Sequence, residues 1–212
     1  MPGKLPSRIH LFALASILSS LSFTSCSTSS FACKGQDHSN KMIVSVRDQK
    51  MLLVSEGIPV KSYKISTSKF GVGDFPGSNR TPLGHMKVAK KIGDKAPLGC
   101  VFKQRRPTGE VVKPNAPGRD PIVTRIIWLT GTETRNRNAY KRGIYIHGTP
   151  EEKRLGRPAS YGCIRMSSRD VTDLYKRINY GADVFIISDS IKGQEPNMAT
   201  AFLKNLPGNT NS

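Results

Sequence analysis

The sequence predicts a mainly β domain, a β-sandwich or a partly closed barrel, with one principal α-helix near the C-terminal end of the domain. Short runs of β-branched and aliphatic residues recur along the chain, and Gly, Pro and polar residues separate them. Only one segment repeats its apolar residues at helical spacing. Many short strands with a single helix are typical of a sheet that packs against a second sheet or closes on itself.

The strands are expected at apolar runs bounded by turn residues. The first two runs flank Asp48-Gln49 in the pattern of a hairpin, and the third alternates apolar with polar residues, as a half-buried strand does. Residues 93–121 carry many Gly, Pro and basic residues, which predicts a long loop with room for one short hairpin. The expected strands are residues 42–46, 51–54, 60–66, 81–92, 122–129, 143–147 and 182–187.

The expected helix follows Ser167. This serine is a good N-cap residue, and Asp170 three positions later completes a capping-box-like pair. Gly181 is expected to end the helix, because glycine adopts the positive φ that a helix C-terminus often needs. Four apolar residues between them fall on one helical face: Val171, Leu174, Tyr175 and Ile178.

Length, composition and charge bound the class of protein. The chain has 212 residues, of which 37% are hydrophobic and 23% charged, so one medium-sized domain with extensions can bury a core. Lys and Arg number 33 against 15 Asp and Glu, which gives a formal net charge of +18. Such a charge favours contact with nucleic acid, anionic lipid or the acidic polymers of a cell envelope. Charge alone does not choose among them.

The N-terminus indicates the compartment. Lys4 and Arg8 precede an apolar run over residues 9–21, which is the layout of an export signal and is shorter than the roughly 20 apolar residues of a membrane-spanning helix. Phe-Thr-Ser-Cys at residues 23–26 resembles a lipobox, in which Cys26 becomes a lipidated first residue. The alternatives are signal-peptidase cleavage near Ala32 or an uncleaved anchor. Export to the periplasm or cell envelope, with or without a lipid anchor, argues against nucleic acid as a partner.

These features divide the chain into four parts. We expect an export signal over residues 1–26, a Ser/Thr-rich linker over residues 27–40, a folded domain over residues 41–188 and a polar tail over residues 189–212. Cys33 and Cys100 could pair in an oxidising compartment, but the sequence does not establish a disulfide, and Cys100 also fits a small buried hydrophobe.

Two segments carry residues that are able to do chemistry. Residues 144–149 form a strand that ends on His147, and residues 160–166 surround Cys163. A thiol attacks as its thiolate, and a neighbouring imidazole removes its proton. Gly162 lets the backbone approach a substrate carbonyl closely, and the consecutive N–H groups of Gly162 and Cys163 are natural oxyanion donors. A lone His or Cys is more often structural, so the hypothesis needs both segments.

Both segments resemble the YkuD-type L,D-transpeptidase family. The family signature is a His-Gly segment followed by Ser-His-Gly-Cys, an aliphatic residue, and Arg or Asn; here it is matched by His147-Gly148-Thr149 and by residues 160–166, Ser-Tyr-Gly-Cys-Ile-Arg-Met. Residues 65–69 and 81–84 are similar to the family's early strand and its Thr-Pro-x-Gly turn. The resemblance covers about residues 41–188 and implies a YkuD-like, mainly β catalytic domain.

The resemblance implies a cysteine acyltransferase that cross-links peptidoglycan stem peptides. Cys163 would attack the carbonyl of the third stem residue, expel the terminal D-alanine and hold the acyl group as a thioester until an amine of a second stem attacks it. His147 would be the general base and acid, with its ring oriented by the Gly148 carbonyl, and Gly162 would supply an oxyanion N–H. Arg165 would support the site or bind a substrate carboxylate; a purely structural ion pair is the alternative.

Further expectations concern substrate, inhibitors and cofactors. The resemblance implies substrate contacts for Tyr145, Ser160 and Tyr161 and acylation by carbapenem-type inhibitors. No metal-ligand spacing such as His-Glu-x-x-His occurs, so we expect no metal, and we expect no cofactor. Tyr161 departs from the family, which most often has His there. Tyrosine forms hydrogen bonds but is uncharged near neutral pH, so we expect an active enzyme with an altered rate or pH profile.

Two other functions stay open on the sequence. Water as the acceptor would make the protein an L,D-carboxypeptidase or an endopeptidase, and the choice depends on how the cleft excludes solvent. A non-catalytic basic module that binds cell-wall polymer or nucleic acid would explain the charge, but it would not explain the residues around Cys163.

Overall fold

A computed structural model describes residue 3 and residues 35–191, and a ten-stranded sheet dominates it. Neighbouring strands follow the order β4-β10-β1-β2-β3-β9-β8-β7-β5-β6, and β4 also pairs with β7. That last pairing closes the strands from β4 to β7 into a ring, so the mainly β, barrel-like prediction is confirmed. The strands are β1 (Asn40–Ser45), β2 (Lys50–Ser55), β3 (Ile58–Ser66), β4 (Gly84–Ile92), β5 (Cys100–Lys103), β6 (Arg106–Val111), β7 (Ile122–Gly131), β8 (Tyr145–Gly148), β9 (Ile164–Met166) and β10 (Asp183–Ile187).

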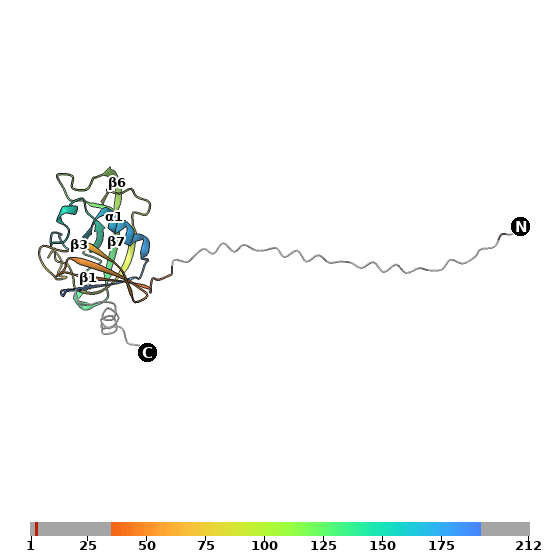
Figure 1. Ribbon diagram of the computed structural model, residues 1–212, viewed down its shortest axis with the longest axis horizontal. Coiled ribbons are helices and arrows are strands. Elements are labelled where there is room, and N and C mark those ends of the chain that lie inside the picture. Colours follow the sequence, from red (N-terminus) through yellow and green to blue (C-terminus); the bar gives the residue numbers. More distant parts are fainter. Residues whose placement is uncertain (1–2, 4–34, 192–212) are drawn as a thin grey trace, which may run out of the picture. The chain divides into compact units, whose positions relative to one another are not determined.

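Most strand predictions agree with the structure. β1 and β2 form the expected hairpin, and Gln49 in its turn has a φ of 50° while its side chain donates to Val46 O and Thr67 Oγ1. The long loop before β7 contains a hairpin, β5–β6, which lies at the end of the domain away from β1 in Figure 1. The segment between β7 and β8 includes a short 3-10 helix, η1 (Thr134–Asn136).

The main core fills the inside of the ring. Alternate residues of each strand point inward, and β7 for example contributes Ile127 and Leu129, which are completely buried. The helix α1 (Ser168–Arg177) adds its predicted stripe to the same cluster, including Val171 and Leu174. Complete burial of each such side chain contributes on the order of 2 kcal/mol, so the helix is held chiefly by this stripe.

The helix begins as predicted and ends differently. Ser167 accepts a hydrogen bond from the Asp170 N–H at 3.0 Å, which is the expected N-cap. Ile178 ends the helix, because its backbone is extended there, with φ −111° and ψ 155°. The prediction that Gly181 ends it is wrong. Gly181 has a φ of +84° in the turn before β10, where a Cβ would collide with the side chain of Gln36.

A second cluster lies on the outer face of the ring and positions the candidate site. It forms between β7, β8 and the β5–β6 hairpin, and Cys163 packs against it. Because strand residues alternate, Ile126 faces this outer cluster while Ile127 faces the inner core. The outer cluster comprises Cys100, Phe102, Ile126 and Tyr145, with Ile92, Ala96, Ile122, Trp128 and Cys163 packed against them.

Residues just beyond the expected domain limits are bonded to the domain. Asp37 Oδ2 accepts from the Asn179 N–H at 2.7 Å, and the Ile191 N–H donates to Asp48 Oδ2 at 2.6 Å. The export signal, Cys26, Cys33 and the tail from residue 192 lie outside the described residues, so those predictions stay predictions. Within residues 35–191, no helix has the length and apolar character needed to cross a bilayer.

Candidate active site

Cys163 sits just before β9, in a turn that requires glycine. Gly162 has a φ of +118°, and a Cβ there would lie 3.3 Å from the Arg80 carbonyl oxygen. The Ser160 hydroxyl donates to Cys163 O at 2.6 Å and accepts from the Gly162 N–H at 3.2 Å. Thr81 Oγ1 donates to Gly162 O at 2.9 Å. Side-chain hydroxyls therefore hold the turn on both sides of the cysteine.

The thiol of Cys163 is protonated near neutral pH. Its Sγ donates to Gly143 O at 3.3 Å and accepts from the Tyr145 N–H at 3.4 Å. Burial raises the pKa of the thiol to about 11, although the Tyr145 N–H and the cations of Arg142 and Arg165 act in the opposite direction. A base is therefore needed to make the sulfur nucleophilic.

His147 has the protonation state and orientation of a base. Its Nδ1 lies 2.8 Å from Gly148 O, so Nδ1–H donates and Nε2 is left as the proton acceptor. The side chain is buried, and burial lowers its pKa to about 4 despite the opposing effects of the Gly148 carbonyl and Asp120. The imidazole is neutral near pH 7, and the contact with Gly148 has the geometry that the resemblance implied.

Parallel pairing of β8 with β9 brings His147 and Cys163 to one face. Ile146 pairs with Ile164 and His147 with Arg165. Cys163 immediately precedes the first paired residue of β9, Ile164, and therefore lies beside Tyr145. Residues two apart on a strand share a face, which places the Cα atoms of His147 and Cys163 roughly 8 Å apart by strand geometry. Within the described residues no hydrogen bond joins them, because the thiol points to Gly143 O. Proton transfer requires the thiol to turn toward Nε2.

A cavity of about 200 Å³ opens at Cys163, between two loops that an ion pair joins. Arg142 Nη1 lies 2.9 Å from Asp74 Oδ1, and Arg142 Nη2 donates to Arg80 O at 2.6 Å. The sequence left two interpretations open for the basic segment 135–142, a solvated loop or the lining of a cleft for an anionic ligand, and Arg142 does line this cavity. The ion pair itself was not predicted, because no local pattern links Asp74 to Arg142. His147 does not line the cavity, whose lining residues are Gly77, Asn79, Arg142, Gly143, Ile144, Tyr161 and Cys163.

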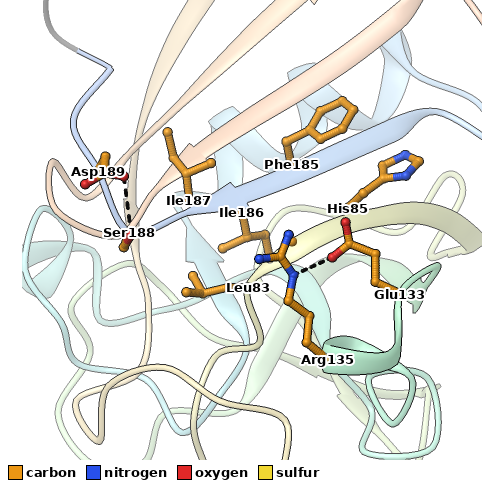
Figure 2. Close-up of a pocket in the computed structure, with 10 residues that line it drawn as sticks. Leu83, His85, Glu133, Arg135, Phe185, Ile186, Ile187, Ser188 and Asp189 are labelled. Atoms are coloured by element: carbon orange, nitrogen blue, oxygen red, sulfur yellow. Dashed lines mark hydrogen bonds and ion pairs between the residues drawn. The ribbon is translucent and has the colours of Figure 1, made fainter. Parts of the chain in front are cut away.

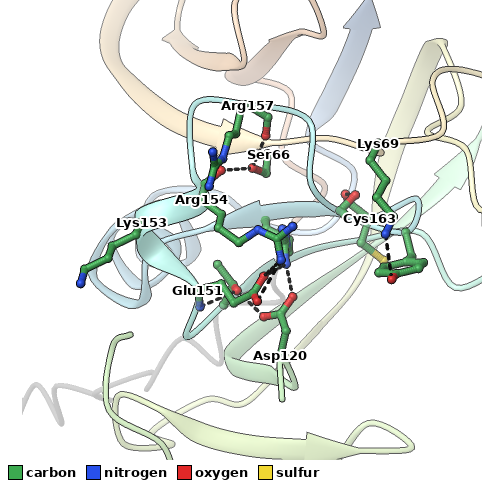
Figure 3. Close-up of polar contacts among 12 residues, drawn as sticks. Ser66, Lys69, Asp120, Glu151, Lys153, Arg154, Arg157 and Cys163 are labelled. Atoms are coloured by element: carbon green, nitrogen blue, oxygen red, sulfur yellow. Dashed lines mark hydrogen bonds and ion pairs between the residues drawn. The ribbon is translucent and has the colours of Figure 1, made fainter. Parts of the chain in front are cut away.

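Arg165 is buried beside His147 in an acidic network, whose carboxylates Asp120 and Glu151 are labelled in Figure 3. Its Nη1 donates to Asp120 Oδ2 and, at 3.1 Å, to Glu151 Oε2. Glu151 also binds the exposed Arg154. Nε and Nη2 of Arg165 have no hydrogen-bond partner in the described part of the chain. The ion pairs match the structural alternative for Arg165, and Nε and Nη2 are buried donors that these ion pairs do not use.

The three residues expected to contact substrate lie in different environments, and only one of them lines the Cys163 cavity. Tyr161 is 63% exposed and lines the Cys163 cavity. Ser160 is buried and its hydroxyl is engaged in the cysteine turn. The Tyr145 ring is buried edge-on against Trp128, and its backbone N–H rather than its side chain reaches Cys163.

The predicted oxyanion donor is engaged in this structure. The Gly162 N–H donates to the Ser160 hydroxyl, so that donor is not open while the turn keeps this geometry. The Tyr145 N–H points at the sulfur instead. This N–H is a hydrogen-bond donor next to the attacking sulfur. The sequence did not single it out, because no side-chain pattern marks a backbone N–H.

The other main cavities within the described residues contain none of the predicted site residues. One of about 180 Å³ surrounds His85 and Phe185 (Figure 2), where His85 stacks on Phe185 and binds Asp183 at 2.8 Å. Another of about 500 Å³ lies under the β5–β6 hairpin and is lined partly by Cys100, which is a free thiol. Among the residues described, no three His, Cys, Asp or Glu side chains are grouped so as to hold a metal ion.

Arg165→Met should lower the free energy of unfolding by about 3 kcal/mol, because it leaves Asp120 and Glu151 beside the site without their buried cation. Arg154→Met removes an exposed partner of the same Glu151 and should cost under about 1 kcal/mol. Urea unfolding of both variants tests the difference. Equal losses would mean that the buried network has no special role in stability.

Buried His147 should make stability fall in acid. In the unfolded chain the imidazole binds a proton near its ordinary pKa of 6.5, whereas in the folded protein its pKa is about 4. The contribution of the neutral imidazole to the free energy of unfolding is therefore complete above pH 6.5 and is lost as the pH falls to 4. The expected loss is about 3 kcal/mol. The free energy of unfolding, measured from pH 7 to pH 4, should fall by about 3 kcal/mol less in His147→Asn than in the natural chain. An equal fall in both proteins would contradict a buried neutral imidazole.

Comparison with known proteins places these residues in a family. The model of the L,D-transpeptidase catalytic domain, YkuD, matches residues 39–186, whereas no curated protein matches the sequence. Solved structures that resemble the chain include an L,D-transpeptidase from Mycobacterium smegmatis (14% identity, 70% of this chain and 58% of that one, TM-score 0.46). They also include one from Mycobacterium tuberculosis H37Rv (17%, 70% and 57%, TM-score 0.46) and L,D-transpeptidase 3 of Mycobacterium tuberculosis with a faropenem-derived adduct (18%, 70% and 60%, TM-score 0.46). The chain spans less than two thirds of these proteins. By its match over residues 39–186, the chain belongs to the YkuD family of L,D-transpeptidase catalytic domains.

Proposed function

We propose that the protein is a peptidoglycan L,D-transpeptidase that forms cross-links between stem peptides through a thioester on Cys163. The observation that carries this proposal is the state of the two side chains on the outer face of β8–β9. A neutral imidazole has its Nδ1–H engaged by Gly148 O, and a protonated thiol opens on a cavity. Family membership supports the same chemistry.

The first half of the reaction forms the thioester. The Sγ–H of Cys163 leaves the Gly143 carbonyl, and His147 Nε2 takes the proton while sulfur attacks the carbonyl carbon of the third stem residue. The Tyr145 N–H, which points at the sulfur, and the Cys163 N–H are the donors we propose for the oxyanion. When the C–N bond breaks, His147 returns the proton to the departing amine of D-alanine.

The second half regenerates the enzyme. An amine of a second stem gives a proton to His147 and attacks the thioester carbonyl, which forms the new amide and releases the thiolate. The same proton then returns to sulfur. Water in place of the amine would give carboxypeptidase activity, so the nature of the acceptor is an outcome of the experiment.

Arg165 has a second proposed role in this reaction. Its Nε and Nη2 are buried next to the His147 strand position and have no partner in the described residues. A buried donor without a partner is costly, and a substrate carboxylate or carbonyl would satisfy it. This role is compatible with the ion pairs to Asp120 and Glu151, which use Nη1 alone.

Incubation of the protein with a disaccharide tetrapeptide tests the reaction. Mass spectrometry should detect cross-linked dimers and free D-alanine, and Cys163→Ala should abolish both products because the attacking atom is gone. His147→Ala should slow the reaction by about 100-fold or more, which is a typical effect for a general base. Tripeptide without dimers would assign the protein as a carboxypeptidase.

A carbapenem provides the control for the nucleophile. Structures of related proteins include complexes or adducts with imipenem and faropenem, and we propose that this chain reacts in the same way. The adduct should map to the peptide that contains Cys163 and should form slowly in His147→Ala. An adduct on buried Cys100 alone would contradict the proposal.

We propose further that the protein is exported and held in the cell envelope, with Cys26 as a lipid anchor. The layout of residues 1–26 supports this proposal. The full chain should partition with membranes in a producing bacterium, and Cys26→Ser should move it to the soluble periplasmic fraction. A soluble natural chain would refute the lipid anchor but leave the catalytic proposal unchanged.

A further inference from the structure

A lysine and a tyrosine form an exposed pair at the rim of the Cys163 cavity. Lys69 Nζ lies 3.0 Å from the hydroxyl of Tyr161, which itself lines the cavity. The same ammonium lies 4.3 Å from the centroid of the Tyr161 ring and 5.2 Å from that of Phe70. Figure 3 shows Lys69 in the close-up that contains Cys163, with its side chain directed to this hydrogen bond. The two rings therefore hold the ammonium near the cavity opening.

The ammonium retains capacity to bind an anion. It has three N–H donors, and the Tyr161 hydroxyl occupies one of them. No carboxylate forms an ion pair with Lys69 in the part of the chain that the structure describes. The hydroxyl of Tyr161 adds a second donor beside the ammonium once it turns toward a ligand. Lys69 also lowers the pKa of this hydroxyl through their hydrogen bond, which makes it a stronger donor.

The acidic residue of the loop beside the cavity is already neutralised by an arginine. Asp74 is the carboxylate held in the loop that forms one wall, and it pairs with Arg142 while both side chains are nearly buried. Asp74 Oδ2 also accepts from the Asn138 N–H at 2.6 Å. Lys69 and the exposed Arg80, which follows the same loop, have no such partner among the described residues. An anionic ligand would meet uncompensated positive charge there.

We propose that Lys69 and Tyr161 form a carboxylate-binding pair that selects ligands with a free carboxylate near the carbon that Cys163 attacks. Two donors side by side, one of them charged, match the two oxygens of a carboxylate. This inference rests on the proposed function only for the identity of the natural ligand, an acyl donor whose leaving amino acid ends in a carboxylate. The pair determines specificity and takes no part in bond making.

Two small alkylating reagents test the pair without any cross-linking substrate. Iodoacetate and iodoacetamide present the same reactive carbon, and only iodoacetate carries a carboxylate. In each case Sγ of Cys163 displaces iodide and its proton passes to the buffer. The rates of both reagents on the full chain are measured at about pH 8, where some thiolate is available. The modified peptide is identified by mass spectrometry, which separates Cys163 from the other cysteines.

Lys69→Met should lower the ratio of the iodoacetate rate to the iodoacetamide rate about tenfold, the effect expected from one charge-assisted hydrogen bond. Tyr161→Phe keeps the ring and removes the hydroxyl, so it should lower the ratio about threefold. Lys69→Arg should keep most of the ratio. Lys176→Met, on exposed α1 surface that contributes nothing to the cavity, should leave the ratio unchanged. Added salt should reduce the ratio in the natural chain.

A ratio that stays the same in Lys69→Met, or falls equally in Lys176→Met, would overturn the inference. This outcome differs from a failure of the proposed function, which would appear as absent cross-linking with carboxylate selection intact. Donor peptides ending in a free carboxylate or in a carboxamide give the matching kinetic test. Lys69→Met should raise KM about tenfold for the carboxylate donor alone and leave kcat nearly unchanged.

Discussion

Parallel pairing of β8 with β9 is the constraint on which the candidate site depends. It sets His147 and Arg165 side by side and leaves Cys163 one step ahead of the paired residues, on the same outer face. The pairing joins segments separated by a long loop, and buried residues of both strands reach the inner core of the ring. A change of register by one residue would send His147 inward, among the apolar side chains of the inner core.

Burial controls the chemistry that this face can perform. The same loss of contact with water lowers the pKa of His147 and raises that of Cys163, so both side chains are neutral before the reaction. A neutral pair needs no counter-ions and is stable in a covered site, whereas a thiolate and an imidazolium would require compensation. The proposed reaction then creates charge only when sulfur attacks, next to the Tyr145 N–H and the cations of Arg142 and Arg165.

Charge is distributed unevenly around this site. On the Arg165 side, Asp120 and Glu151 neutralise the buried guanidinium. On the opposite side, the Asp74–Arg142 pair holds two loops together, and Lys69 at the cavity opening binds Tyr161 and forms no ion pair within the described residues. The excess of basic residues in the whole chain therefore has a local counterpart near Cys163. The proposed carboxylate-bearing substrate would meet this side first.

Local sequence determined the parts of the protein that depend on neighbours along the chain. Most strands, the Ser167 cap and the apolar stripe of α1 follow from residue spacing, whereas β9 was not predicted. The segments around His147 and Cys163 carried the family resemblance. The helix end was misplaced because a glycine near a helix terminus serves equally well in the turn before a strand, where Gln36 packs.

Tertiary structure decided what depends on residues far apart in the sequence. The closure of the ring through β4 and β7, the pairing of Asp74 with Arg142 and the contact of Lys69 with Tyr161 each join segments with no shared local pattern. Burial likewise follows from the whole fold, and with it the neutral states of His147 and Cys163. Composition and spacing identify which residues can react, but only folding determines how much water, and which charges, surround them.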